Sequence, residues 1–235
     1  MLKIVGVMVA VLLTACVNPQ PQILSSVNIT DEQPQAVEPT TYQVRFNFVI
    51  FEKEIADNPM IAEAFSKALK EWVSNLPVEC IIFQEKENSF PFISFGSAAI
   101  SSQQGIIKVH IIDVHAEPYN LPPPVLGFWS WEDNILALDK NALSIDPDRA
   151  YAVCMHELGH IFGLEHFVNT HNLEAQSGYI VVSDNFPASK LVMYPLSSED
   201  NIHAKLSNLE IELAKKNLLN LKQLAHNNCF QLTSQ

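Results

Sequence analysis

The chain has 235 residues, of which 48% are hydrophobic and 17% are charged, and its formal net charge at pH 7 is −12. This composition predicts a folded domain with a real core and argues against a disordered chain. It also argues against a nucleic-acid partner, because phosphate binding needs clustered Lys and Arg, and acidic residues outnumber basic ones here by 26 to 14.

The N-terminus is typical of an export signal. Lys3 precedes the apolar run Ile4–Leu13, which is far shorter than the roughly 20 residues that span a bilayer. Leu13-Thr14-Ala15-Cys16 resembles the lipobox of bacterial lipoproteins. That resemblance implies a cleaved signal peptide (1–15), a lipid on Cys16 and a membrane-anchored place in the bacterial cell envelope, at the outer membrane. The alternative is an ordinary signal peptide with an incidental cysteine. Residues 16–41, rich in Pro, Gln, Asn and Ser, predict a flexible tether.

The rest of the chain shows the periodicities of an α+β domain, expected over residues 42–228 and followed by a tail at 229–235. Alternating residues at 42–51 predict a half-buried strand. A second strand is expected at 79–85, with an apolar centre at 81–83. Further strands are expected at 106–114, 125–131 and 134–138, with an apolar arm at 90–100. Asn58-Pro59 and Asp146-Pro147 predict helix starts, because Asn and Asp cap helices and Pro fits the first turn. A last helix is expected at 208–225, from its leucines at 209, 213, 218, 219 and 221. Together the elements give a mixed sheet with about three helices.

Four cysteines occur, at positions 16, 80, 154 and 229. An exported domain offers the conditions for one disulfide, and Cys80 with Cys229 is the suggested pair. Cys154 stands two residues before His156, so on a helix the two side chains point about 200° apart. Core packing is therefore the favoured interpretation of Cys154, and metal ligation is not.

One segment carries the chemistry: His156-Glu157-Leu158-Gly159-His160-Ile161-Phe162-Gly163-Leu164-Glu165-His166. Its first two histidines lie one helical turn apart, so both imidazoles can reach one Zn²⁺. Gly163 lets the helix end, because glycine adopts the left-handed conformation cheaply, and His166 can return as the third ligand. Glu157 can reach a water on the metal. Three imidazoles leave the fourth position open, which is typical of a catalytic zinc.

This segment resembles the zinc motif of the metzincin peptidases, and within that clan most closely the matrixins of the matrix-metalloproteinase type. Leu191-Val192-Met193-Tyr194-Pro195 resembles the Met-containing turn of the clan, and residues 205–210 resemble the matrixin pattern at the start of the last helix. The resemblance implies a twisted, mostly parallel sheet with an antiparallel edge strand. It also implies one catalytic Zn²⁺, with Met193 supporting the floor of the site.

The expected activity is that of a zinc metalloendopeptidase. Glu157 would act as general base on a zinc-bound water that hydrolyses peptide bonds of proteins. By the same resemblance, the substrate would lie extended along residues 125–131, and a pocket would be walled by residues 194–198. The substrate-binding candidates are Leu126, Gly127, Phe128, Tyr194 and Pro195. Simple core packing is the competing interpretation of the aromatic residues at 128, 129 and 131.

The chain also departs from the matrixin pattern. Phe167 stands where matrixins usually carry Ser, and the stretch from His166 to Met193 is longer than is typical. No clear acidic loop for structural Ca²⁺ is found. Asp113 and His115 are candidates for a second metal site, although a polar strand end is favoured.

Three alternatives stay open at this point. The first is a lipid-anchored zinc-binding module without turnover. The second is a zinc hydrolase that acts on a non-peptide bond, and the third is a structural envelope lipoprotein with a fortuitous motif. The oligomeric state is left open as well.

Overall fold

A computed structural model describes residues 43–86, 106–169, 179–182, 187–195, 202–221 and 231–233. The predicted signal peptide, the tether, Cys16, the arm at 90–100, residues 196–198 of the expected pocket wall and Cys229 lie outside these ranges. No helix in the described ranges combines the length and the apolar character that a membrane crossing requires.

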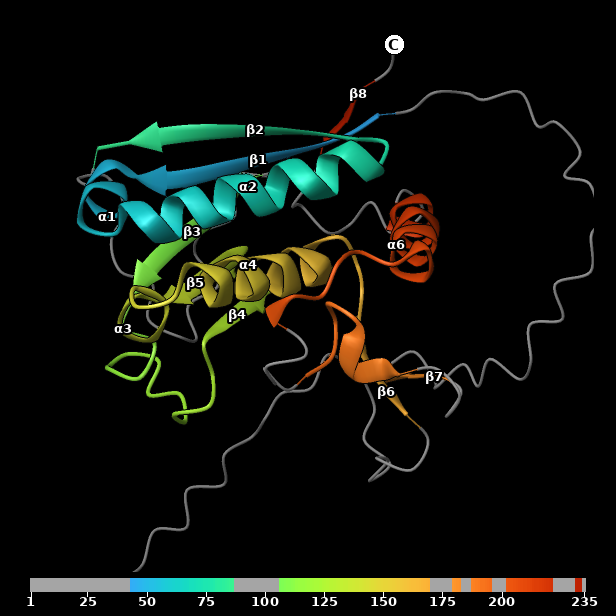
Figure 1. The fold of residues 1–235 in the computed structure, drawn as a ribbon. Coiled ribbons are helices and arrows are strands. Elements are labelled where there is room, and N and C mark those ends of the chain that lie inside the picture. The colour runs from blue at the N-terminus through green and yellow to red at the C-terminus, as the bar shows by residue number, and fades with distance from the viewer. Residues whose placement is uncertain are drawn as a thin grey trace, which may run out of the picture.

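The larger sheet is mixed. Four strands run parallel in the order β2 (Val78–Glu85), β1 (Gln43–Phe51), β3 (Ile106–Ile112) and β5 (Ile135–Asp139). An edge strand, β4 (Gly127–Ser130), pairs antiparallel with β5 (Figure 1). The short β8 (Gln231–Thr233), within the segment assigned to a tail, pairs antiparallel with the start of β1. The predicted α+β class is confirmed, with a mostly parallel sheet and an antiparallel edge strand.

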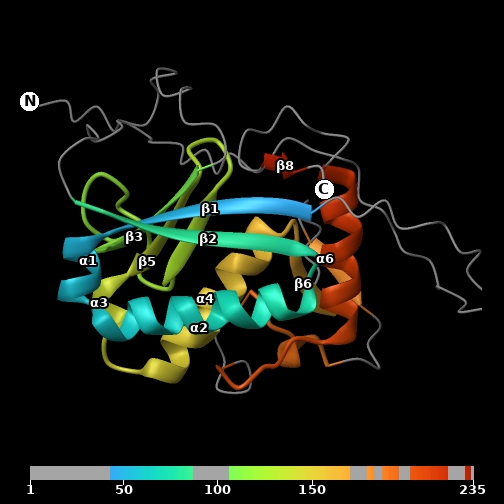
Figure 2. The ribbon, with the colours of Figure 1, turned by 90° about the horizontal axis from the view of Figure 1, so that it is seen from above.

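Three longer helices accompany the sheet, as predicted. α2 (Pro59–Asn75) and α4 (Pro147–Ile161) lie side by side, and the Trp72 indole N–H donates to the Met155 carbonyl, 3.0 Å away. α6 (Asn208–Leu221) runs across one end of both helices (Figures 1 and 2). Short helices α1 (Glu52–Asp57) and α3 (Lys140–Leu143), the 3₁₀ turn η2 (Ala188–Lys190) and a parallel pair of strands, β6 (His166–Asn169) and β7 (Tyr179–Val182), complete the elements.

The two Asx-Pro helix starts turn out differently. The Asp146 carboxylate accepts hydrogen bonds from the backbone N–H groups of Asp148 and Arg149, at 3.0 and 3.2 Å, so it caps α4 as expected. The side chain of Asn58 does not cap α2. It donates instead to the Glu54 carbonyl, 3.1 Å away, because the unpredicted helix α1 ends there.

The main core fills the space between the sheet and the two long helices. Cys154 belongs to it and is fully buried, which confirms its predicted role. Two strand predictions need correction. β1 lies between β2 and β3, so residues on both of its faces are buried, Asn47 and Val49 included. β2 lies at the edge, and its predicted apolar centre is partly exposed, at 37% for Ile82 and 46% for Phe83.

Candidate metal centre

A turn at Gly163 joins the two elements that carry the three histidines. α4 supplies His156 and His160 and β6 begins at His166. Gly163 has φ +86°, in the left-handed region where only glycine is unstrained. Its N–H donates to the His160 carbonyl, and the Leu164 N–H donates to the Gly159 carbonyl, at 3.0 and 2.9 Å. The helix therefore ends tightly enough for the chain to return to its own last turn.

The three imidazoles converge on one point. Nε2 of His166 lies 3.0 Å from Nε2 of His156 and 3.3 Å from Nε2 of His160. Ligands at 2.0–2.1 Å from a tetrahedral Zn²⁺ stand about 3.3 Å from one another. The three ligands named from the sequence are thus brought together at the spacing of one zinc ion.

Backbone carbonyls fix the tautomers of two of these rings. Nδ1 of His156 donates to the Val192 carbonyl and Nδ1 of His160 donates to the Leu164 carbonyl, each at 2.8 Å. A carbonyl only accepts, so both Nδ1 atoms carry the proton and both Nε2 atoms present a lone pair. His166 Nε2 faces both lone pairs and carries at most one proton to share between them. A single cation satisfies the whole set, so the donor chemistry fits zinc.

The surroundings keep the histidines neutral, which is the form that binds a metal. Burial and the neighbouring His160 and His166 lower the pKa of His156 to about 3. Burial and then His160 lower the pKa of His166 to about 4. Burial also lowers the pKa of His160. A cluster of protonated imidazoles is therefore unfavourable at neutral pH.

Glu157 follows His156 on α4 and lies against the edge strand β4. It is buried, and burial raises the pKa of its carboxyl group to about 8. A Cβ atom at Gly127 of β4 would stand 3.2 Å from its Cγ. The structure therefore brings Glu157 of the zinc motif together with Gly127, one of the predicted substrate-binding residues.

The other two residues predicted beside Gly127 have packing roles. The Phe128 ring contacts Tyr119, with ring centroids 5.1 Å apart, in a small cluster that includes Val114 and Ile135. Leu126 packs against the main core. For the Phe128 side chain, core packing is therefore the interpretation that the structure supports.

The Met-containing turn lies under α4. Met193 is fully buried, and a Cβ atom on Gly159, between the two helical histidines, would overlap its sulfur. The Met193 carbonyl accepts from Phe167 N–H at 2.9 Å, and its own N–H donates to the Glu210 carboxylate at 3.0 Å. The turn thus contacts α4, β6 and α6 at once. Tyr194 and Pro195 follow directly, both half-buried.

Several contributors to the site were not singled out from the sequence. Gly159 lies inside a helix, where glycine lowers helix stability by about 1 kcal/mol relative to alanine. A glycine at such a position indicates close packing, and this was the signal in the sequence. Glu210 is fully buried on a helix that the leucine pattern describes as amphipathic. Tyr179 pairs in register with His166, and their rings lie 5.7 Å apart. No sequence signal pointed to Tyr179.

Asp113 and His115 form a polar turn. The Asp113 carboxylate accepts from the His115 N–H at 3.0 Å, and His115 Nδ1 donates to the Leu121 carbonyl at 2.9 Å. His115 Nε2 stands 3.8 Å from the Asp139 carboxylate. Over the described ranges, the histidine triad is the one group of three or more His, Cys, Asp and Glu side chains that is close enough to share a metal ion.

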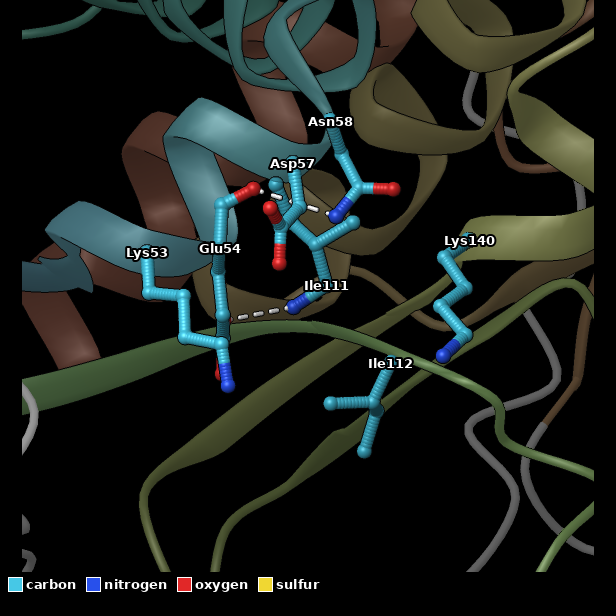
Figure 3. Close-up of a pocket in the computed structure, with 7 residues that line it drawn as sticks. All are labelled: Lys53, Glu54, Asp57, Asn58, Ile111, Ile112 and Lys140. Carbon is cyan, nitrogen blue, oxygen red and sulfur yellow. Dashed lines mark hydrogen bonds between the residues drawn. The ribbon is translucent and has the colours of Figure 1, made fainter.

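A hollow of about 370 Å³ lies elsewhere, at the carboxyl ends of β1 and β3 (Figure 3). The Glu54 carboxylate lines this hollow and accepts a hydrogen bond from the Ile111 N–H at 2.8 Å. Asp57, Asn58 and Lys140 also line the hollow. None of its lining residues belongs to the histidine site, and none carries a thiol, hydroxyl or imidazole. This hollow is therefore separate from the histidine triad.

No known family profile matches the chain, and no curated protein matches it. Among solved structures, the archaemetzincin from Methanopyrus kandleri is similar over 78% of this chain and 99% of its own, with a TM-score of 0.45 and 18% sequence identity. A likeness at this level does not assign the chain to a family.

Proposed function

We propose that the chain is a zinc-dependent metalloendopeptidase. The main support is that three histidine Nε2 atoms converge at the spacing expected around one zinc ion. In two of these rings, Nδ1 donates its proton to a backbone carbonyl. A buried carboxyl group, next in sequence to the first ligand, lies against the edge strand at Gly127. A structural zinc site would fill its fourth position with a protein ligand, whereas the described residues offer three.

The residues take distinct roles. His156, His160 and His166 hold the metal, which when bound supplies a Lewis acid that acidifies water and polarises a carbonyl group. Glu157 accepts the proton of the attacking water on its carboxylate, and the adjacent positive charge favours the ionised form. Glu157 then delivers that proton to the leaving amine. Met193 supports the ring of His156 from below through the neighbouring Val192 carbonyl.

The edge strand supports an extended peptide as substrate. The Asp139 N–H donates to the Leu126 carbonyl at 2.9 Å, so Leu126 and the alternate residues of β4 bond inward to β5. By that alternation, the backbone groups of Gly127 and Trp129 point outward, where the described sheet has no further strand. A peptide can add there by backbone hydrogen bonds, with Glu157 next to Gly127.

A metzincin of matrixin type is the proposed relationship. Its support is the extended zinc motif, Met193 packed directly beneath Gly159, and an antiparallel edge strand beside Glu157. The parallel pair β6 and β7 occupies part of the unusually long stretch between His166 and Met193. Tyr194 and Pro195 remain the proposed wall of the specificity pocket.

Anchoring through Cys16 to the bacterial outer membrane is proposed from the sequence alone. Metabolic labelling with a palmitate analogue tests it directly. Label should enter the parent chain and be absent from the Cys16→Ala variant. Equal labelling of both, or none in the parent, would remove the anchor from the proposal.

The activity is tested on the full chain and its Glu157→Gln variant, by zinc content and by cleavage of casein and a quenched peptide library. Stoichiometric zinc in both, with cleavage only in the parent, is the expected result. Removing zinc with a chelator should abolish cleavage, and returning zinc should restore it. Zinc without cleavage would indicate a binding module, turnover of small esters alone would indicate a non-peptide hydrolase, and absence of zinc would refute the proposal.

A further inference from the structure

Helix α6 contacts the turn that lies between the second and third histidines. Asn217 Nδ2 stands 2.6 Å from the Gly163 carbonyl oxygen, across 54 residues of sequence. A carbonyl only accepts, so the Asn217 amide must present its NH₂ group and donate. A Cβ atom at Gly163 would come within 3.0 Å of Asn217 Cβ, so the helix backs directly onto this turn.

The peptide group between Gly163 and Leu164 lies next to the carbonyl that orients His160, and the chain continues from it to His166. The N–H of the same peptide unit belongs to Leu164, and it donates to the Gly159 carbonyl at 2.9 Å. The carbonyl of Leu164 accepts the Nδ1 proton of His160 at 2.8 Å. His166 follows two residues later. A rotation of this peptide plane would move the acceptor of His160 and the chain entry to His166 together.

Asn217 is itself held on a packed element. Ala214 and Leu218 on the same helix are buried, at 0% and 1% exposure, and Glu210 two turns earlier accepts from the Met193 N–H. Gly163, in contrast, has the most freely rotating backbone of any residue type, at φ +86°. A donor on a packed helix therefore restrains the glycine at which the chain turns from α4 toward β6.

We propose that Asn217 is a positioning residue for the metal centre, which fixes the Gly163 turn so that His160 and His166 meet at one ion. This inference rests on the proposed zinc site. Groups that orient metal ligands typically contribute about 10- to 100-fold to affinity. Asn217 acts one hydrogen bond further out, so a loss near the lower end, about 10-fold, is expected.

The test uses the full chain with three substitutions. Asn217→Asp keeps the size of the side chain and loses the donor, Asn217→Ala loses both, and Lys216→Ala is the control on the exposed side of the same helix. Zinc affinity is measured by competition with a chromophoric chelator. The visible absorption of the Co²⁺-loaded chain reports ligand geometry, and urea unfolding of the metal-free chain reports stability. Both Asn217 variants should weaken zinc about 10-fold and change the Co²⁺ spectrum, and the control should match the parent.

The outcomes separate the two proposals. If the parent takes up no zinc, the proposed function fails and Asn217 has no centre to position. If the parent binds zinc and Asn217→Asp binds it equally well with an unchanged Co²⁺ spectrum, only the inference on Asn217 is overturned. A variant that loses stability while keeping zinc affinity and spectrum would likewise show that Asn217 serves folding alone. Should Asn217→Ala fail to fold, the isosteric Asp variant decides.

Discussion

Substitution of Gly159 by alanine tests how tightly the Met-containing turn is packed beneath the helix. In an exposed helix, Gly→Ala stabilises by about 1 kcal/mol, because alanine is the better helix former. Here the added Cβ would overlap the sulfur of Met193 and stand 3.4 Å from the Trp72 ring. Overpacking of a core costs about 1–3 kcal/mol. The net expectation for Gly159→Ala is a loss of about 0–2 kcal/mol in the free energy of unfolding.

A second background isolates the contact. In the Met193→Ala chain the obstructing sulfur is gone, so Gly159→Ala should regain its intrinsic benefit of about 1 kcal/mol. The effect of Gly159→Ala on the free energy of unfolding should therefore differ between the parent and the Met193→Ala chain by about 1–3 kcal/mol. This difference is the coupling energy between Gly159 and Met193. Methionine is adaptable, so a value toward the lower end is reasonable. Urea unfolding of the four metal-free chains measures this coupling.

Zinc affinity provides an independent readout of the same cycle. Displacing Met193 moves the adjacent Val192 carbonyl, which holds the Nδ1 proton of His156. Zinc binding by Gly159→Ala should therefore weaken by about 10-fold. If Gly159→Ala instead stabilised both backgrounds by the same amount and left zinc affinity unchanged, the turn would not be packed as described, and the reasoning would be refuted.

Three further outcomes are expected. The folded-state pKa values of His156 and His166, about 3 and 4, lie below the usual 6.5, so at these groups the unfolded metal-free chain binds protons first. The raised pKa of Glu157, about 8, acts in the opposite direction, so the measurement uses the Glu157→Gln chain. Its stability should fall as the pH falls from about 6.5 to 4, and a urea midpoint that stays constant over that window would contradict this. Gly127→Ala places a Cβ 3.1–3.2 Å from three neighbours, Cγ of Glu157 among them, and should therefore lower kcat on the order of 10-fold with zinc content unchanged. An unaltered kcat would separate the edge strand from the chemistry. Glu210→Ala leaves backbone N–H donors unpaired and should lower the free energy of unfolding by about 2–4 kcal/mol. The control Glu212→Ala, at an exposed position of the same helix, should change it by no more than about 0.5 kcal/mol, and urea unfolding of both variants measures the difference.

Much of the fold followed from local signals. The three long helices were predicted from Asx-Pro pairs at their starts or from the helical spacing of their apolar residues. Both signals depend only on residues that are close together in the chain. What failed depended on neighbours distant in sequence. The apolar centre of β2 predicted burial, yet Ile82 and Phe83 are partly exposed because the strand lies at an edge. Periodicity reports a preference for burial and carries no information on which strand takes the edge.

The last helix shows the same limit from the opposite side. The leucines that predicted this helix are not all buried, because Leu209 and Leu219 are 37% and 58% exposed, while Glu210 is fully buried. The reason lies outside the helix: the Met-containing turn has a backbone N–H that must be satisfied, and Glu210 accepts it. A carboxylate buried for that purpose is invisible to a count of apolar residues.

That the three histidines lie together could be predicted from the sequence, and their orientation could not. Eleven consecutive residues contain all three histidines, because an (i, i+4) pair and a glycine turn are local devices. The tautomers, however, depend on the carbonyls of Val192 and Leu164, and the positions of those carbonyls depend on contacts with α6. The motif thus supplies the metal-binding atoms, and a helix about fifty residues later supplies the restraints that aim them. It follows that substitutions on the buried face of α6 should alter metal affinity, whereas substitutions on its exposed face should not.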